Sequence, residues 1–189
     1  MKTTKWVLDP SHSELGFKIK HLMISNVSGS FSDFTAVAEM EGADFETAHI
    51  HLRVDVASIN THNSQRDEHL RTSDFFDVRT YPEMSFESER VKRIDQENYK
   101  VFGNLTMKGI TKPVELNAEY NGVTKDPWGG ERAGFTVTGK IKRSEWEVNF
   151  NALLETGGVA LSDEVKIQSE LQLVKQAIMI ANNVNAIAI

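Results

Sequence analysis

The stretch TAHIHLRVDVASI (Thr47–Ile59) alternates apolar and polar side chains at nearly every position. The apolar set is Ala48, Ile50, Leu52, Val54 and Val56, and the polar set between them is His49, His51, Arg53 and Asp55. Successive side chains of a β-strand point to opposite faces, so a period of two indicates one buried and one wet face. The sequence therefore predicts a half-buried strand here.

The same period of two recurs along most of the chain, for example in ELGFKIKHL (Glu14–Leu22). Short turn motifs separate neighbouring runs, among them KGIT around Gly109 and DPWGG at Asp126–Gly130. With NVSGSFSDFTAVAEM (Asn26–Met40) included, the chain contains about eight expected strands joined mostly by short loops. Antiparallel strands with one wet face favour either a β-sandwich or a closed up-and-down barrel. The fold class is therefore all-β.

Length and composition limit the classes of protein to which the chain can belong. A chain of 189 residues with 40% hydrophobic and 25% charged residues is typical of one soluble domain. The net charge of -6 gives no general attraction to nucleic acids or anionic membranes, so neither is an expected partner, and no membrane insertion is expected. With no cysteine, thiol catalysis is excluded. The N-terminus lacks the apolar core of a signal peptide, so a cytoplasmic location is expected, or a periplasmic or secreted one if a signal has been trimmed.

The charged stretch QRDEHLRTSDFFD (Gln65–Asp77) breaks the strand pattern. Asn63 can cap a helix, and Leu70, Phe75 and Phe76 supply a narrow apolar edge. A short helical cap over residues 64–76 at one end of the sheet is the resulting prediction. Paired carboxylates in this block could serve acid/base chemistry, but i, i+4 pairs such as Asp67 with Arg71 are typical of helix surfaces.

Histidines supply the other candidates for chemistry. His49 and His51 lie two apart on one strand face, where an imidazole pair could hold a metal, but no third ligand is placed by spacing, so no metal site is predicted. His12 lies beside Asp9, Ser11 and Ser13, which suggests a nucleophile with a base. Asp, Ser and Pro before a strand are also ordinary turn residues, so a structural interpretation is favoured.

Several ordered motifs resemble the bacterial YceI family. They are W-x-L-D-P-x-H-S (Trp6–Ser13), F-x-I-K-H-L (Phe17–Leu22), G-x-F-x-x-F (Gly29–Phe34), RDEHLRTSDFFDVRTYPEMSFES (Arg66–Ser88), GNLTMKGITKPV (Gly103–Val114) and R-x-x-W (Arg143–Trp146). The similarity covers about Lys5 to Val174, which defines a barrel domain over residues 5–174. Residues 175–189 form an apolar C-terminal extension, which together with the resemblance leads us to expect a homodimer.

The resemblance implies an eight-stranded antiparallel lipocalin-like barrel whose interior binds a long amphiphile, such as a polyisoprenoid or an isoprenoid quinone, without a catalytic cofactor. An eight-stranded barrel can hold one small ligand. The expected barrel lining is Phe17, Ile19, Phe31, Ile50, Leu52, Val54, Val56, Phe75, Phe86, Leu105, Phe135, Ile141, Trp146 and Phe150. The candidates for contact with a head group are His12 and Arg66, and Arg66 could instead pair with Asp67.

Three functions remain open from the sequence. The leading one is non-enzymatic binding, transport or sequestration of a long-chain isoprenoid or similar lipid. The second is a barrel enzyme that acts on a hydrophobic substrate through His12 or the Arg66–Asp67 block. The third is an interaction module whose barrel is filled by its own aromatic side chains.

Overall fold

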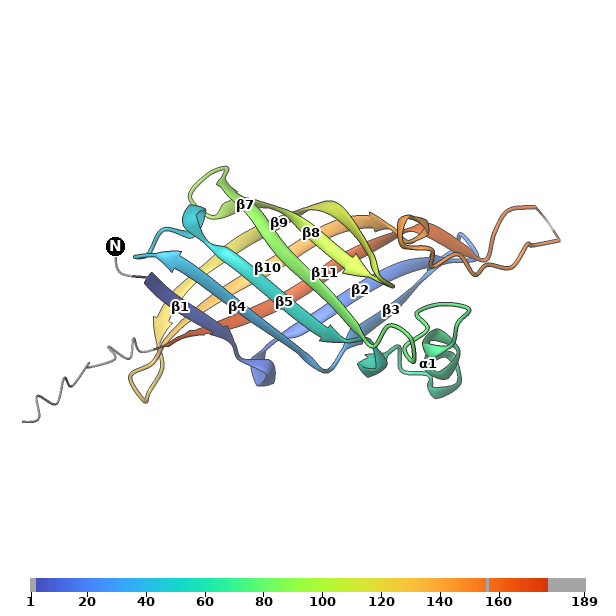
Figure 1. The fold of residues 1–189 in the computed structure, drawn as a ribbon, viewed down its shortest axis with the longest axis horizontal. Helices are drawn as coiled ribbons and strands as arrows, with labels where there is room; N and C mark the ends of the chain where they lie inside the picture. Colours follow the sequence, from blue (N-terminus) through green and yellow to red (C-terminus); the bar gives the residue numbers. More distant parts are fainter. Residues whose placement is uncertain (1–2, 156, 177–189) are drawn as a thin grey trace, which may run out of the picture.

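The alternation of buried and exposed residues continues around a closed antiparallel β-barrel, seen in the computed structural model of residues 3–155 and 157–176 (Figure 1). The strands are β1 (Thr3–Leu8), β2 (Glu14–His21), β3 (Ser25–Phe31), β4 (Phe34–Glu41), β5 (His49–Asp55), β6 (Ile59–Asn60), β7 (Glu83–Arg93), β8 (Asn98–Met107), β9 (Ile110–Lys125), β10 (Glu131–Lys142) and β11 (Leu161–Lys175). The helical segments are α1 (Ser64–Arg71) and the 3-10 helices η1 (Pro10–His12), η2 (Phe45–Thr47), η3 (Val56–Ser58) and η4 (Arg143–Trp146).

Within the described residues these segments make eight barrel strands, because three strands are each broken in two. β1 and β2 are separated by η1, β3 and β4 by Ser32 and Asp33, and β5 and β6 by η3. The pairing order β1-β4-β5-β7-β8-β9-β10-β11 returns to β1, while β2, β3 and β6 continue the three broken strands beside β11. The prediction of an eight-stranded barrel is confirmed.

The three breaks lie side by side and form what we call the crease. The Asp33 backbone N–H donates to Ser58 Oγ at 3.0 Å, and the Asp55 N–H donates to the Asp33 carbonyl at 2.9 Å. η1 lies opposite the same break, since β1 pairs with β4 and β2 pairs with β3. Asp55 ends β5 by accepting a bond from the Ala57 N–H, so the alternation that begins at His49 stops before Val56.

The helical cap is shorter than the expected residues 64–76. Asn63 accepts a bond from the Arg66 N–H and begins α1, as an N-cap asparagine does. The helix ends at Arg71, because Thr72 is extended and its N–H and hydroxyl both bond to the His69 carbonyl. The chain from Thr72 to Tyr81 continues in hydrogen-bonded turns instead.

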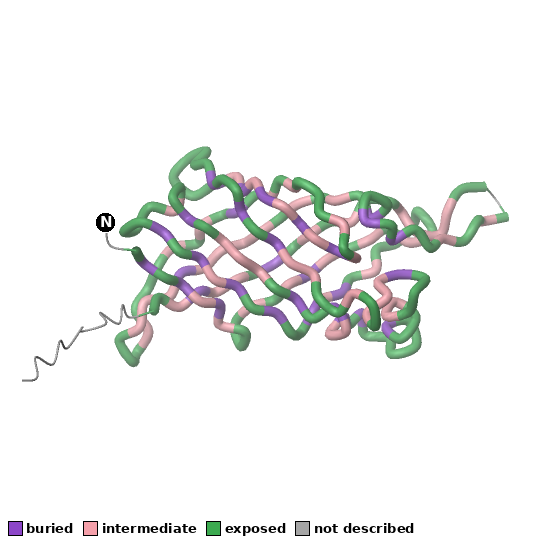
Figure 2. The backbone as a smooth tube through the Cα atoms, viewed as in Figure 1, coloured by how far each residue is buried: buried purple, intermediate pink, exposed green. Residues whose placement is uncertain are grey.

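Packing inside the barrel brings backbone and side chains close together at β8. A Cβ at Gly103 would lie 2.6 Å from Phe86 Cζ and would also overlap the Glu87 carbonyl oxygen. Only glycine fits there, since real Cβ atoms do not approach other atoms so closely. Figure 2 shows buried and less buried residues alternating along the strands, which is the pattern of a barrel with a wet outside.

The two ends of the described chain lie at the same end of the barrel, opposite α1 (Figure 1). The Gln176 N–H donates to the Lys5 carbonyl at 2.8 Å. Most of the predicted apolar extension 175–189, with the homodimer expected from it, lies outside the described residues, which end at position 176.

Candidate ligand-binding site

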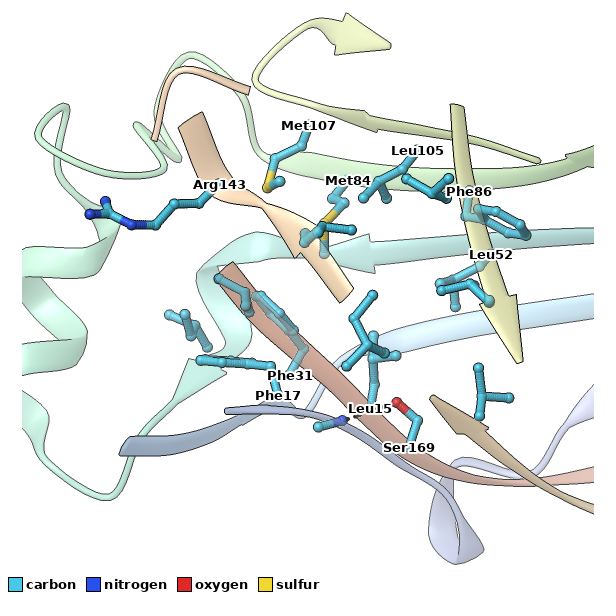
Figure 3. Close-up of a pocket in the computed structure, with 18 of the residues that line it drawn as sticks. Leu15, Phe17, Phe31, Leu52, Met84, Phe86, Leu105, Met107, Arg143 and Ser169 are labelled. Carbon is cyan, nitrogen blue, oxygen red and sulfur yellow. Dashed lines mark hydrogen bonds between the residues drawn. The ribbon is translucent and has the colours of Figure 1, made fainter. Parts of the chain in front are cut away.

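The barrel encloses a cavity of about 520 Å³. This volume is within the range of about 300–1,000 Å³ that small-molecule sites usually have. Inward-facing residues of every barrel strand supply its wall, and ten of its lining residues are labelled in Figure 3. They are Leu15, Phe17, Phe31, Leu52, Met84, Phe86, Leu105, Met107, Arg143 and Ser169.

A cluster of aromatic rings lies at the end of the cavity opposite α1. Phe45 of η2 packs with its ring centroid 5.1 Å from that of Tyr120 and 5.2 Å from that of Phe135, and it meets Tyr99 edge-on at 6.0 Å. All four of these rings are buried or half-buried. Burial raises the pKa of the Tyr120 phenol, and the neighbouring Tyr99 adds to this shift.

The other end of the cavity reaches solvent. Arg66, His69, Phe150 and Ala152 are the exposed residues among those described that line the cavity, and all four come from α1 or from the segment between β10 and β11. The rings of His69, Phe75 and Phe150 meet there with centroids 4.9–5.1 Å apart. We call this end the mouth.

Arg143 is a buried cation beside the mouth. Its Nε donates to the Ser162 carbonyl at 3.0 Å, and its Nη1 donates to the carbonyls of Val148 at 2.6 Å and Phe150 at 2.9 Å. The guanidinium thereby fixes the chain between η4 and β11 to the barrel. Burial lowers the pKa of Arg143, and the charge of Asp163 opposes this shift.

Arg66 also lines the cavity near the mouth, but it does not pair with Asp67. Arg66 Nε donates to Thr61 Oγ1 at 2.7 Å and Nη2 donates to the Thr61 carbonyl at 2.7 Å. Asp67 is only 6% exposed and accepts from the Thr61 N–H at 2.9 Å and from Thr61 Oγ1 at 2.6 Å. Asp67 also makes no surface pair with Arg71, which instead donates to the carbonyls of Ala57 and Ile59. This part of the charged block therefore joins α1 to the crease.

Eleven of the fourteen predicted lining residues border the cavity, and three do not. The eleven are Phe17, Ile19, Phe31, Ile50, Leu52, Phe75, Phe86, Leu105, Phe135, Ile141 and Phe150. Val54 is 1% exposed and Val56 2% exposed, both packed in the core beside the crease. Trp146 is fully buried in η4, where its Nε1 donates to the Leu105 carbonyl at 3.1 Å.

His12 lies away from the cavity, on the outer wall of the barrel beside Arg132. Both Ser11 Oγ, at 3.1 Å, and Asp9 Oδ2, at 2.9 Å, approach the same ring atom, His12 Nδ1. A serine–histidine–aspartate relay needs the serine and the carboxylate on opposite ring nitrogens. Hydrogen bonds from Ser11, His12 and Arg132 hold the pKa of the Asp9 carboxyl well below its usual range. The arrangement is a structural turn at the crease.

The histidine pair of β5 is not brought to a metal-binding geometry. His49 Nε2 lies 3.2 Å from Glu87 Oε1, while His51 Nε2 accepts a bond from Arg53 Nε at 3.0 Å. Across the described ranges no three His, Cys, Asp or Glu side chains gather closely enough to hold a metal ion.

The sequence interpretation missed several lining residues, notably Arg143, Phe45, Met84 and Tyr99. Met84 and Tyr99 lie in alternating runs, so the period of two was a usable signal for them. Phe45 belongs to a turn segment, η2, and nothing in its local sequence indicates that it points inward. The only signal for Arg143 in the sequence was its place in the R-x-x-W motif, which does not indicate that it lines the cavity.

A comparison with known protein families matches residues 6–173 to the family described as YceI-like domain. The chain belongs to the YceI-like family. A UPF0312 protein of Staphylococcus aureus is 42% identical over 170 residues, covering 89% of this chain and 96% of that relative. The crystal structure of a Campylobacter jejuni YceI protein matches with a TM-score of 0.73 at 39% identity, covering 89% of this chain and 96% of that one.

The YceI-like barrel also shares its fold with a polyisoprenoid binding domain from Saccharophagus degradans. That structure gives a TM-score of 0.60 at 17% identity and covers 92% of this chain and 98% of its own. The part of the chain that the structure describes has no helix both long and apolar enough to span a membrane.

Proposed function

We propose that this barrel binds a long-chain isoprenoid or a similar amphiphilic lipid and carries or shields it without chemical change. The observation that carries the proposal is the 520 Å³ apolar cavity, with aromatic rings at one end and a mouth at the other. A barrel of the same fold bears the name polyisoprenoid binding domain, which agrees with this assignment.

The distribution of polar groups suits an amphiphile. Among the described residues that line the cavity there is no carboxylate, and the two arginines, Arg66 and Arg143, both lie near the mouth. An apolar tail inside gains about 0.8 kcal/mol per buried methylene, so shape and burial can hold it with few polar contacts. A head group at the mouth would then meet cationic donors, which favours one that carries hydrogen-bond acceptors or negative charge.

Native mass spectrometry of the purified chain, followed by organic extraction of whatever it carries, tests the proposal. We expect a stoichiometric long-chain adduct. A clean unliganded mass that persists after incubation with polyprenyl diphosphates and isoprenoid quinones would refute lipid binding and favour an interaction module.

A substitution inside the barrel makes the same test specific to the cavity. Ala36 is buried and lines the cavity, whereas its neighbour Thr35 is exposed. Ala36→Phe should displace about four methylenes of the tail at ~0.8 kcal/mol each, which corresponds to a loss of affinity of at least about 100-fold. Thr35→Phe is the matched control and should bind like the parent chain.

The variant His12→Ala distinguishes the enzymatic alternative from the proposed lipid carrier. His12 lies outside the cavity, and Ser11 Oγ approaches the same ring nitrogen as Asp9 Oδ2, so Ser11 is not placed as the nucleophile of a serine–histidine–aspartate relay. We expect unchanged ligand affinity and no change in the extracted lipid. Conversion of a bound lipid by the parent chain that stops in His12→Ala would establish an enzyme instead.

A further inference from the structure

The tip of the β2–β3 hairpin carries apolar side chains where turn chemistry disfavours them. The Ile24 N–H bonds to the His21 carbonyl at 3.2 Å, and the two central residues have positive φ, 51° at Leu22 and 60° at Met23. This is the pattern of a type I′ turn, which strongly prefers Asn-Gly. The β8–β9 hairpin has a loop one residue shorter, also with positive φ at two successive residues, and it uses glycine at the second of them, Gly109.

The same tip is exposed. Leu22 is 39%, Met23 58% and Ile24 84% exposed. Leucine and methionine are unfavourable at positions of positive φ, and here their side chains are exposed to water and contribute little packing to the core. Such positions are expected to serve binding rather than folding.

The tip lies beside the mouth of the cavity. The Leu22 N–H donates to the Ala160 carbonyl at 2.8 Å, and both Ala160 and His21 line the cavity. The neighbouring segment adds Phe150, 40% exposed, and Leu153, 88% exposed. Figure 1 shows this hairpin, the segment between β10 and β11, and α1 at one end of the barrel. We call Leu22–Ile24, Phe150 and Leu153 the rim.

The segments that carry the rim contain no acidic side chain. Between Leu15 and Ser32 the charged residues are Lys18 and Lys20, and Val148–Leu154 carries no charge. These segments can therefore enter an apolar layer without desolvating an acidic group, which would be costly. The net charge of -6 gives no general attraction to an anionic membrane.

We propose that the rim docks on the interfacial region of a lipid bilayer, so that the mouth opens into the membrane. The inference rests on the proposed lipid-binding function, because a long-chain isoprenoid resides in membranes and would otherwise have to cross water. Apolar side chains on two adjacent loops, inserted to the depth of the acyl boundary, hold the barrel upright with its mouth facing the lipid.

Flotation of the full chain with vesicles of pure phosphatidylcholine tests the docking. The double variant Met23→Ser/Ile24→Ser should reduce vesicle-bound protein at least about tenfold, which corresponds to about 1.4 kcal/mol. The matched control is Trp128→Ser, since Trp128 is 85% exposed in the loop between β9 and β10, which lies at the opposite end of the barrel (Figure 1), and this variant should bind vesicles like the parent chain.

Three outcomes would overturn the docking proposal. They are failure of the parent chain to float, loss of binding in Trp128→Ser but not in the rim variant, and binding that requires anionic phosphatidylglycerol and vanishes in salt. The first of these outcomes, joined with a change in sedimentation of the rim variant relative to the parent chain, would assign the rim to contact between copies of the chain.

A second measurement separates this inference from the proposed function. Neither Met23 nor Ile24 lines the cavity, so the rim variant should bind an isoprenoid quinone added from organic solvent as tightly as the parent chain. Its extraction of the same quinone from phosphatidylcholine vesicles should slow at least about tenfold. Failure of the parent chain to bind both the quinone and a polyprenyl diphosphate from solvent would refute the proposed function, while flotation would still decide the docking.

Discussion

Replacing Arg143 with methionine is expected to lower the free energy of unfolding by about 3–5 kcal/mol. The side chain is 6% exposed and donates to the carbonyls of Val148, Phe150 and Ser162, which lie on the segment that follows η4 and on β11. Methionine fills a similar space but offers no donor, so all three carbonyls lose their partner.

The magnitude follows from counting these bonds. A hydrogen bond from a charged group contributes about 1.5–3 kcal/mol, so three sum to roughly 5–9 kcal/mol. Part of this loss of stability is offset, because methionine carries no charge and the cost of burying the Arg143 charge, which also lowers its pKa, no longer opposes folding. For a chain of this length, a loss of about 3–5 kcal/mol corresponds to a fall in Tm of roughly 6–20 °C.

Urea denaturation followed by circular dichroism measures the change. Lys142→Met is the matched control: the adjacent side chain is exposed, and its replacement should move the unfolding free energy by no more than about 0.5 kcal/mol. A loss below about 1 kcal/mol for Arg143→Met, with an unchanged m-value, would show that the three bonds do not hold the mouth segment to the barrel.

Three further changes should act on stability, each measured by urea denaturation. Gly103→Ala should cost about 1–3 kcal/mol, because the added Cβ overlaps a backbone oxygen, whereas Gly134→Ala has its nearest neighbour at 3.5 Å and should be nearly neutral; equal effects would contradict the steric argument. Asp67→Ala should cost about 2–4 kcal/mol by leaving the buried N–H and the hydroxyl proton of Thr61 without an acceptor, and a cost under 1 kcal/mol would count against that network. Because the pKa of Asp9 is lower in the folded chain, the unfolded chain binds a proton at this carboxyl first as the pH falls, and the stability that the charged carboxyl provides at neutral pH is lost below about pH 3.8. Asp9→Asn should therefore flatten the decline of the unfolding free energy in acid, and an unchanged decline would count against this role of Asp9.

Local alternation was sufficient to predict the strands, because the period of two is a property of a strand and its two environments. The strand expected within Thr47–Ile59 forms as β5, although only from His49 to Asp55, and the glycine at position 109 separates β8 from β9. The barrel itself followed from the family resemblance, since alternation alone left a sandwich equally open.

The crease and the aromatic cluster at the end of the cavity opposite α1 could not be predicted, because both depend on contacts between residues distant in the chain. Val56 continues the alternating pattern but belongs to η3, where a hydrogen bond to Asp55 ends the strand. Asp67 looked like one half of a surface pair, and its burial became visible only once Thr61 was placed beside it. Phe45 reaches the interior from a turn, and no periodicity marks such a residue.

The pairing that completes the ring has a consequence for how the chain is made. Leu8 of β1 pairs with Leu173 of β11, so the seam joins the first strand to be synthesised with the last. Until β11 leaves the ribosome, β1 and β10 present open edges, and the apolar inner wall faces water. Domains generally fold as units during synthesis, and exposed edges of this kind invite aggregation. A nascent chain that stops before Leu161 therefore cannot seal its barrel, and it should depend on chaperones until the final strand arrives.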